Sequence, residues 1–182
     1  REAFATKQES GLVRLWQLTN TRYCLGVAGN VVDQLNQLLD PVKKRFRVHT
    51  AFTFGLARPE GPLVVQTNAT GPFALIEFDG ALPRAALYSH WQVSTNSGEI
   101  LERLADPGFD PGQTVWIQGP ATLPGAAGAP AAAVPVEFTH YGPKQIDLRV
   151  QATGASVLLL NDKFDPQWRV TVDGQPRELL RC

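Results

Sequence analysis

The chain has 182 residues, of which 43% are hydrophobic, 19% charged and 9% aromatic, enough apolar side chain for one large or two small cores and too much for wholesale disorder. Its 17 basic residues equal its 17 acidic ones, so nothing in the charge favours binding to nucleic acid or to an anionic membrane surface. No apolar run reaches the roughly 18–20 residues that a membrane helix needs.

The two ends of the sequence and its cysteines bear on its origin. The chain begins with Arg1, contains no methionine, and stops soon after a turn signal. We therefore expect a piece of a longer protein.

The two cysteines, Cys24 and Cys182, form neither a metal motif nor a CxxC pair. We predict one buried and one exposed thiol, and the sequence leaves open both their redox state and the cellular compartment.

The first part of the chain alternates between helical and strand patterns. Apolar residues at helical spacing predict helices over 10–19 and 31–39. Period-two alternation between Gly–Pro turns predicts the strands, which span 23–27, 46–54, 62–68 and 73–80.

A strand–helix–strand unit follows. Residues 82–94 read as one strand, 96–106 as a helix and 114–119 as a second strand. Asn96 at the helix start and Glu99 three residues later match a capping box, in which each side chain bonds the backbone amide of the other residue. These features predict an α+β subdomain over residues 1–119.

The segment 120–135 consists almost entirely of Ala, Gly and Pro. Such a composition is typical of a linker or an exposed loop, and long structureless loops are uncommon inside compact domains. We therefore predict the domain boundary here.

The last part, residues 136–182, has strand patterns only. Strands are predicted at 136–141, 145–153, 156–162 and 168–174, with Asp173–Gly174 as a hairpin turn. Residues 156–161, "SVLLLN", lack polar–apolar alternation, which predicts a central strand covered on both faces. The fold class is therefore α+β, with an antiparallel β-sandwich in which strands 46–80 are candidates to join residues 136–182.

Motifs of catalysis and metal binding are missing from the sequence. His49, His90 and His140 are scattered in strand patterns, and no HExxH, Cys/His cluster or GxSxG occurs. Most aspartates adjoin Gly, Pro or Asn, where their side chains accept hydrogen bonds from turn amides. The sequence thus predicts no catalytic residue, no metal site and no cofactor.

The four tryptophans are the remaining candidates for a binding site. Trp16 and Trp116 lie in apolar patterns that predict burial in the core. Trp91 and Trp168 lie at the ends of predicted strands. They are our candidate ligand contacts, as platforms for a sugar ring, with packing in the core as the alternative for both.

Three stretches resemble, in order and spacing, the bacterial YfhO-like membrane proteins, a polytopic family related to the C-type glycosyltransferases. They are "LWQLTNTRYCLG" (15–26), "LPRAALYSHWQVSTNSGEILERLADPGFDPGQTVWIQ" (82–118) and "LLLNDKFDPQWRVTVDGQP" (158–176). The chain departs from the family at Gln167, where Pro-Gly-Trp is usual, and lacks the Gly-His rich strand and final membrane helix that follow.

The resemblance implies an extracytoplasmic domain, periplasmic or on the cell surface, anchored through a multi-spanning parent. Catalysis in the family is expected from acidic residues in loops outside this stretch, so no catalytic residue is carried over. A non-catalytic accessory domain that docks on its parent chain or positions a glycan or polymer is the leading hypothesis. A carbohydrate-binding module and a soluble hydrolase with an unrecognised site are the alternatives.

Overall fold

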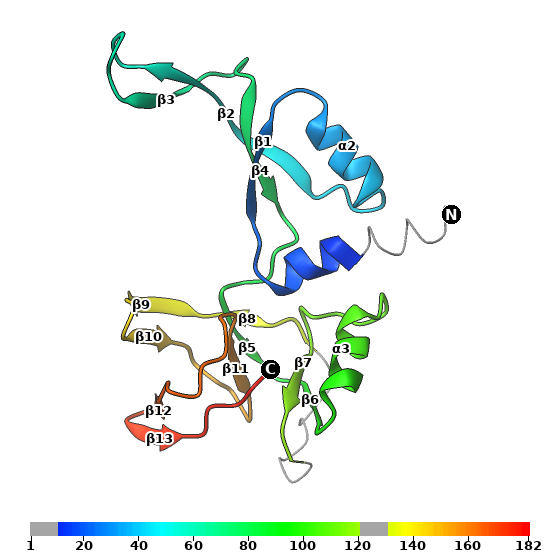
Figure 1. Ribbon diagram of the computed structural model, residues 1–182. Coiled ribbons are helices and arrows are strands. Elements are labelled where there is room, and N and C mark those ends of the chain that lie inside the picture. The colour runs from blue at the N-terminus through cyan, green and yellow to red at the C-terminus, as the bar shows by residue number, and fades with distance from the viewer. Residues whose placement is uncertain (1–10, 121–130) are drawn as a thin grey trace. The chain divides into compact units, whose positions relative to one another are not determined.

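The computed structural model describes residues 11–120 and 131–182 and shows a mixed α+β fold in which strands predominate (Figure 1). The chain divides into two compact units, residues 1–81 and 82–182. None of the helices in the described part is long and apolar enough to cross a membrane.

The division between Ala81 and Leu82 differs from the boundary predicted in the segment 120–135. Strand β5 (Ala85–Tyr88) pairs with β8 (Val134–Pro135) and with β11 (Val157–Leu160), so backbone hydrogen bonds join the chain on both sides of the Ala/Gly/Pro-rich segment. Within that segment, residues 121–130 lie outside the described residues.

The first unit contains a four-stranded antiparallel sheet in the order β1-β4-β2-β3. Its strands are β1 (Tyr23–Val27), β2 (Phe46–Leu56), β3 (Leu63–Thr67) and β4 (Phe73–Phe78). All four were predicted, with bounds that differ by a few residues at most. A β-bulge in β2, between Val48 and Thr50, shifts its register against β4.

Two helices, over residues 11–18 and in α2 (Val31–Leu38), pack on one face of this sheet. The buried residues of this core are Val13, Phe46, Ala74, Ile76 and Phe78. The predicted core residue Trp16 packs against them, with its ring centroid 5.6 Å from that of Phe46.

The two cysteines are both free thiols. Cys24 is half-buried and Cys182 is exposed.

A buried carboxylate fixes the connection between α2 and β2. Asp40 accepts hydrogen bonds from Arg45 Nε at 2.8 Å, from Arg45 Nη2 at 3.1 Å and from the Arg45 backbone amide at 2.9 Å. Burial raises the pKa of Asp40, but these hydrogen bonds outweigh it and hold the pKa below its ordinary value.

The second unit contains the predicted strand–helix–strand unit. Strands β6 (Trp91–Ser94) and β7 (Val115–Gln118) pair in parallel and are connected through α3 (Ser97–Ala105). The single strand predicted over 82–94 is in fact two, β5 and β6. The break has a topological cause, because β5 pairs in an antiparallel sheet whereas β6 pairs with β7 in another.

The predicted cap of α3 is present, with one change. Asn96 Oδ1 accepts hydrogen bonds from the amides of Gly98 and Glu99. Instead of a direct bond from the Asn96 amide to Glu99, Ser94 Oγ accepts from that amide at 3.0 Å and donates to Glu99 Oε2 at 2.7 Å. Ser94 thus completes the capping box.

The other sheets of this unit are antiparallel and small. They comprise a three-stranded sheet in the order β11-β5-β8, the pair β9 (Glu137–Tyr141) and β10 (Ile146–Arg149), and the pair β12 (Val170–Val172) and β13 (Gln175–Arg177). The prediction of a central strand at 156–161 was wrong, because β11 lies at the edge of its sheet and β5 is central.

The core of the second unit forms around Tyr88, Trp91 and Ile117. The Tyr88 hydroxyl donates to the carbonyl of Pro111 at 2.9 Å, and burial raises the pKa of Tyr88 to about 12.

The hairpin turn predicted at Asp173–Gly174 is confirmed. Asp173 and Gly174 have φ of 51° and 75°, the left-handed pair that a type I′ turn requires.

Candidate functional site

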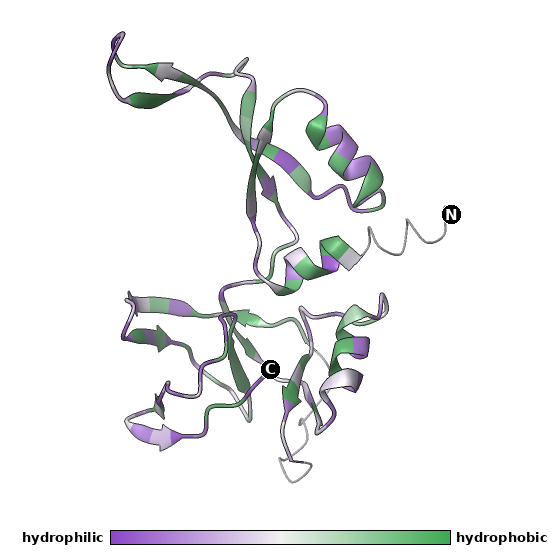
Figure 2. Ribbon diagram, in the orientation of Figure 1, coloured by the Kyte–Doolittle hydropathy of each residue, from purple (hydrophilic) through white to green (hydrophobic). Residues whose placement is uncertain are grey.

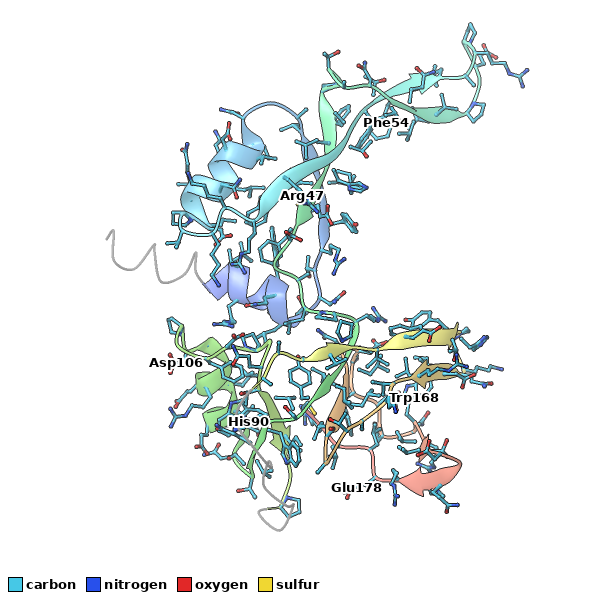
Figure 3. All side chains as sticks on the ribbon, turned by 180° about the vertical axis from the view of Figure 1, so that it is seen from behind. Arg47, Phe54, His90, Asp106, Trp168 and Glu178 are labelled. Carbon is cyan, nitrogen blue, oxygen red and sulfur yellow. The ribbon has the colours of Figure 1, made fainter. Side chains whose placement is uncertain are left out.

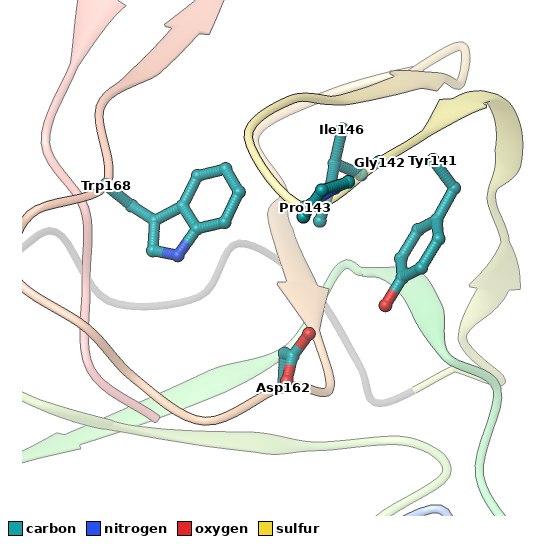
Figure 4. Close-up of a pocket in the computed structure, with 6 residues that line it drawn as sticks. All are labelled: Tyr141, Gly142, Pro143, Ile146, Asp162 and Trp168. Carbon is teal, nitrogen blue, oxygen red and sulfur yellow. The ribbon is translucent and has the colours of Figure 1, made fainter.

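The second unit carries a surface groove of about 380 Å³ (Figure 4). Its lining residues are Tyr141, Gly142, Pro143, Ile146, Asp162 and Trp168. A neighbouring recess of about 360 Å³, lined by Arg84, Phe138 and Tyr141, shares Tyr141 with the groove. Tyr141 therefore borders both the groove and the recess.

One wall comes from the β9–β10 hairpin. Tyr141 pairs with Ile146 across the ladder, so their side chains lie on the same face. The turn between them is closed by a hydrogen bond from the Gly142 amide to the Gln145 carbonyl at 2.9 Å. Phe138 contacts Tyr141 edge to face, at a centroid distance of 5.7 Å, and supports its ring.

The indole of Trp168 lies on the other side of Pro143 and Ile146 from Tyr141 in Figure 4 and forms the second wall. The turn before it is fixed by Asp165, whose Oδ1 accepts from the Gln167 amide at 2.8 Å and whose carbonyl accepts from the Trp168 amide at 3.3 Å. Trp168 keeps 38% of its surface exposed, so part of its ring is available to a ligand.

Arg84 joins Tyr141 to Asp162. Its Nη2 donates to Asp162 Oδ2 at 2.8 Å and also to the Tyr141 hydroxyl, and its guanidinium lies 5.4 Å from the centroid of the Tyr141 ring. The positive charge of Arg84 is thereby balanced by Asp162. The groove combines apolar ring faces with hydrogen-bonding groups and has no net charge from this pair.

Such an arrangement suits a neutral polyhydroxylated ligand. Aromatic faces stack against apolar surfaces of a ligand, while a few polar groups fix its orientation. A carboxylate has about four lone-pair positions. Asp162 uses two of them on Arg84 and on the Lys163 amide, so it retains acceptor capacity for ligand hydroxyls.

The two tryptophans predicted as ligand contacts lie in different environments. Trp168 lines the groove, whereas Trp91 is only 7% exposed and packs against Tyr88 and Ile117 in the core. Sequence reasoning did not identify Tyr141, Asp162 or Arg84 as part of a site. The proximity of Asp162 to Trp168 in "NDKFDPQW" was the only available signal.

His49, His90, Asp106 and Asp110 are not among the residues that line the groove. His90 Nδ1 lies 3.1 Å from Thr114 Oγ1, and His49 Nδ1 lies 3.5 Å from Glu77 Oε2. Asp106 and Asp110 accept hydrogen bonds from the backbone amides of Gly108 and Gly112, as predicted for turn residues. His90 and Asp106 are labelled in Figure 3. Across residues 11–120 and 131–182, no three His, Cys, Asp or Glu side chains are grouped to hold a metal ion.

No protein-family model, curated protein or solved structure matches this chain.

Proposed function

We propose that this chain is a non-catalytic accessory domain that holds a glycan or polymer, on the extracytoplasmic side of a polytopic bacterial membrane protein related to glycosyltransferases. The groove between Tyr141 and Trp168 is the observation that carries the binding role. The three stretches that resemble the YfhO-like family support the membrane context. In that context the domain's protein partner is the rest of its own parent chain.

The groove favours a neutral sugar over a charged ligand. Both walls are aromatic, and Asp162, which lines the groove, forms an ion pair with Arg84. A ligand carboxylate or phosphate would compete with Asp162 for Arg84, and a cationic ligand would compete with Arg84 for Asp162. A neutral ring leaves the pair intact while it stacks between Trp168 and Tyr141.

A free-standing carbohydrate-binding module is the second candidate, and the same groove supports it. The two proposals differ in the parent and not in the site. Hydrophobic spans encoded next to this stretch favour the accessory domain, whereas an independent reading frame favours the module.

A glycan array probed with the 182-residue chain tests the binding role. We expect binding to neutral glycans that Trp168→Ala abolishes. Phe164→Ala is the matched control. Phe164 comes from the same segment and is 41% exposed, close to the 38% of Trp168, but it contacts Arg181 and is not part of the groove lining. Binding to no glycan, or equal loss in both variants, contradicts the proposal. Turnover of a glycosyl donor by the chain alone contradicts its non-catalytic part.

A further inference from the structure

The groove and the neighbouring recess in the second unit are two cavities of nearly equal size. Their volumes are about 380 Å³ and about 360 Å³. Both values lie near the lower end of the roughly 300–1,000 Å³ that small-molecule sites span. Each cavity therefore suits a single small ring, and neither is large enough for a long stretch of a chain.

Two contacts link the cavities. Tyr141 lines both of them, so its ring borders the groove and the recess at once. Arg84, which lines the recess, donates through Nη2 to Oδ2 of Asp162, which lines the groove, at 2.8 Å. The shared ring and the ion pair place the cavities next to each other, so a single ligand chain can reach both.

The two cavities offer opposite hydrogen-bonding groups. The groove has the carboxylate of Asp162, which only accepts, and the recess has the guanidinium of Arg84, which only donates. Arg84 uses Nη2 on Asp162 and on the Tyr141 hydroxyl. In the described part of the chain no group accepts a hydrogen bond from its Nε or Nη1. These donors are available to a ligand oxygen in the recess.

Each cavity also has an aromatic side chain of its own. Trp168 lines the groove and is 38% exposed, and Phe138 lines the recess and is half-buried. Figure 2 shows that the β9–β10 hairpin, which carries Phe138 and Tyr141, mixes hydrophobic and hydrophilic residues. The groove and the recess thus repeat one combination, an aromatic ring beside one member of an ion pair.

We infer that the groove and the recess are adjoining subsites for successive rings of a linear neutral glycan, which the domain binds along its length and not at one terminal ring. The inference rests on the proposed function, because it takes the groove as the glycan site. A repeating chain presents similar ring faces and hydroxyls at every unit. Two linked cavities of nearly equal volume match that repetition, whereas a single ring fills one cavity and leaves the other to water.

Hydroxyl groups are the one type of ligand group that satisfies both cavities. A hydroxyl both donates and accepts, so one hydroxyl can donate to Asp162 in the groove and another can accept from Arg84 in the recess. Both bonds use positions that the ion pair leaves free, because Asp162 retains lone pairs and Arg84 retains Nε and Nη1. The ion pair therefore stays intact while a neutral chain spans the two subsites.

Isothermal titration calorimetry of the 182-residue chain with oligosaccharides of increasing length tests the inference. The probes are glucose and its β1–4-linked di-, tri- and hexasaccharide, beside the same lengths of any other neutral repeat that binds on the glycan array. We expect Kd to fall on the order of a hundredfold from the mono- to the trisaccharide, because the second ring binds intramolecularly once the first is in place. The hexasaccharide should add only the small statistical gain of more binding registers.

Phe138→Leu separates the two subsites. It removes the aromatic ring of the recess and keeps an apolar side chain against Tyr141. This variant should weaken trisaccharide binding about fivefold and leave monosaccharide binding unchanged. Phe164→Leu is the matched control, because it makes the same change beside Arg181, outside both cavities, and it should alter neither affinity. Circular dichroism checks that both variants are folded.

The outcomes separate this inference from the proposed function. Equal Kd values for the mono- and the trisaccharide overturn the inference but not the proposed function, because the groove alone then binds one ring. The same holds if folded Phe138→Leu binds the trisaccharide as the wild type does. Binding of no probe, together with an empty glycan array, overturns both. The length series needs only the wild type, so it decides the inference even if Phe138→Leu does not fold.

Discussion

Arg84 and Asp162 are 78 residues apart in the sequence, yet Arg84 Nη2 lies 2.8 Å from Asp162 Oδ2. The cause is strand register. Ala85 pairs with Leu160 in the β5–β11 ladder, and the Asn161 amide donates to the Arg84 carbonyl at 2.8 Å. Arg84 directly precedes β5, and Asp162 follows the end of β11. Because β5 and β11 are paired at these ends, the strand pairing of the core brings Arg84 and Asp162 together beside the groove.

Arg84→Ala should therefore affect binding more than stability. Both partners of its ion pair are more than 40% exposed, and exposed pairs contribute about 0.2–1 kcal/mol. Loss of Arg84 also releases Tyr141, so glycan affinity should fall by about tenfold, equivalent to about 1.4 kcal/mol. Calorimetric titration and urea unfolding measure the two effects. Arg149→Ala, which removes an ion pair with Glu137, serves as the control and should leave affinity unchanged.

Asp40→Asn should destabilise the first unit at neutral pH by about 1–3 kcal/mol, because it weakens hydrogen bonds to a buried, charged partner. The pKa of Asp40 is lowered by folding from an ordinary value of 3.8. Its contribution is therefore complete above that value and is lost as the pH falls through the lower folded-state pKa. The difference in free energy of unfolding between the wild type and Asp40→Asn should shrink accordingly below about pH 4.

Asp33→Asn is the control for that experiment, because Asp33 is exposed on α2. Urea denaturation at pH 7 should show a change within about 0.5 kcal/mol for it. If the Asp40→Asn difference is constant with pH, Asp40 has no lowered pKa in the folded state.

Gly174→Ala should destabilise the β12–β13 hairpin by about 1 kcal/mol, because a Cβ is strained at the φ of 75° that Gly174 adopts. Asp173→Asn should be tolerated, since asparagine adopts the left-handed region readily. Amide hydrogen exchange of Val170–Val172 reports the hairpin directly. Equal exchange rates in wild type and Gly174→Ala would refute the turn assignment.

Asn96→Ala removes the cap of α3 and should cost about 1 kcal/mol. Ser94→Ala tests the indirect capping box, since it breaks both hydrogen bonds of the Ser94 hydroxyl. It should cost about 0.5–1.5 kcal/mol, although Ser94 lies outside α3. Thermal unfolding of the two single variants and the double variant measures the coupling. Full additivity would mean that Ser94 does not act through the cap.

Local chemistry made much of the fold predictable. Asn96 as a cap, Asp173–Gly174 as a turn and the aspartates beside glycine follow from backbone preferences of single residues and their near neighbours. The predicted strands of the first unit were also found, because one covered face imposes alternation on each strand.

The misplaced predictions all depend on strand partners far away in the sequence. Residues 82–94 have strand character throughout, but only pairing with β11 and β7 shows that the chain changes sheets after Tyr88. Residues 157–160 are apolar enough for a central strand, yet they form β11, which lies at the edge of its sheet. The groove was likewise hidden, because Tyr141 lies in the β9–β10 hairpin, Trp168 in the segment before β12, and Arg84 just before β5.

Tryptophan fluorescence titration tests the central claim, that the groove binds a neutral glycan, most directly. Trp91 and Trp116 are buried, whereas Trp168 is exposed and lines the groove. A neutral oligosaccharide selected on the array should change the emission of the wild type in a saturable manner, and the change should vanish in Trp168→Phe. A saturable change of equal size in Trp168→Phe, or none in the wild type with any neutral oligosaccharide, would contradict the account.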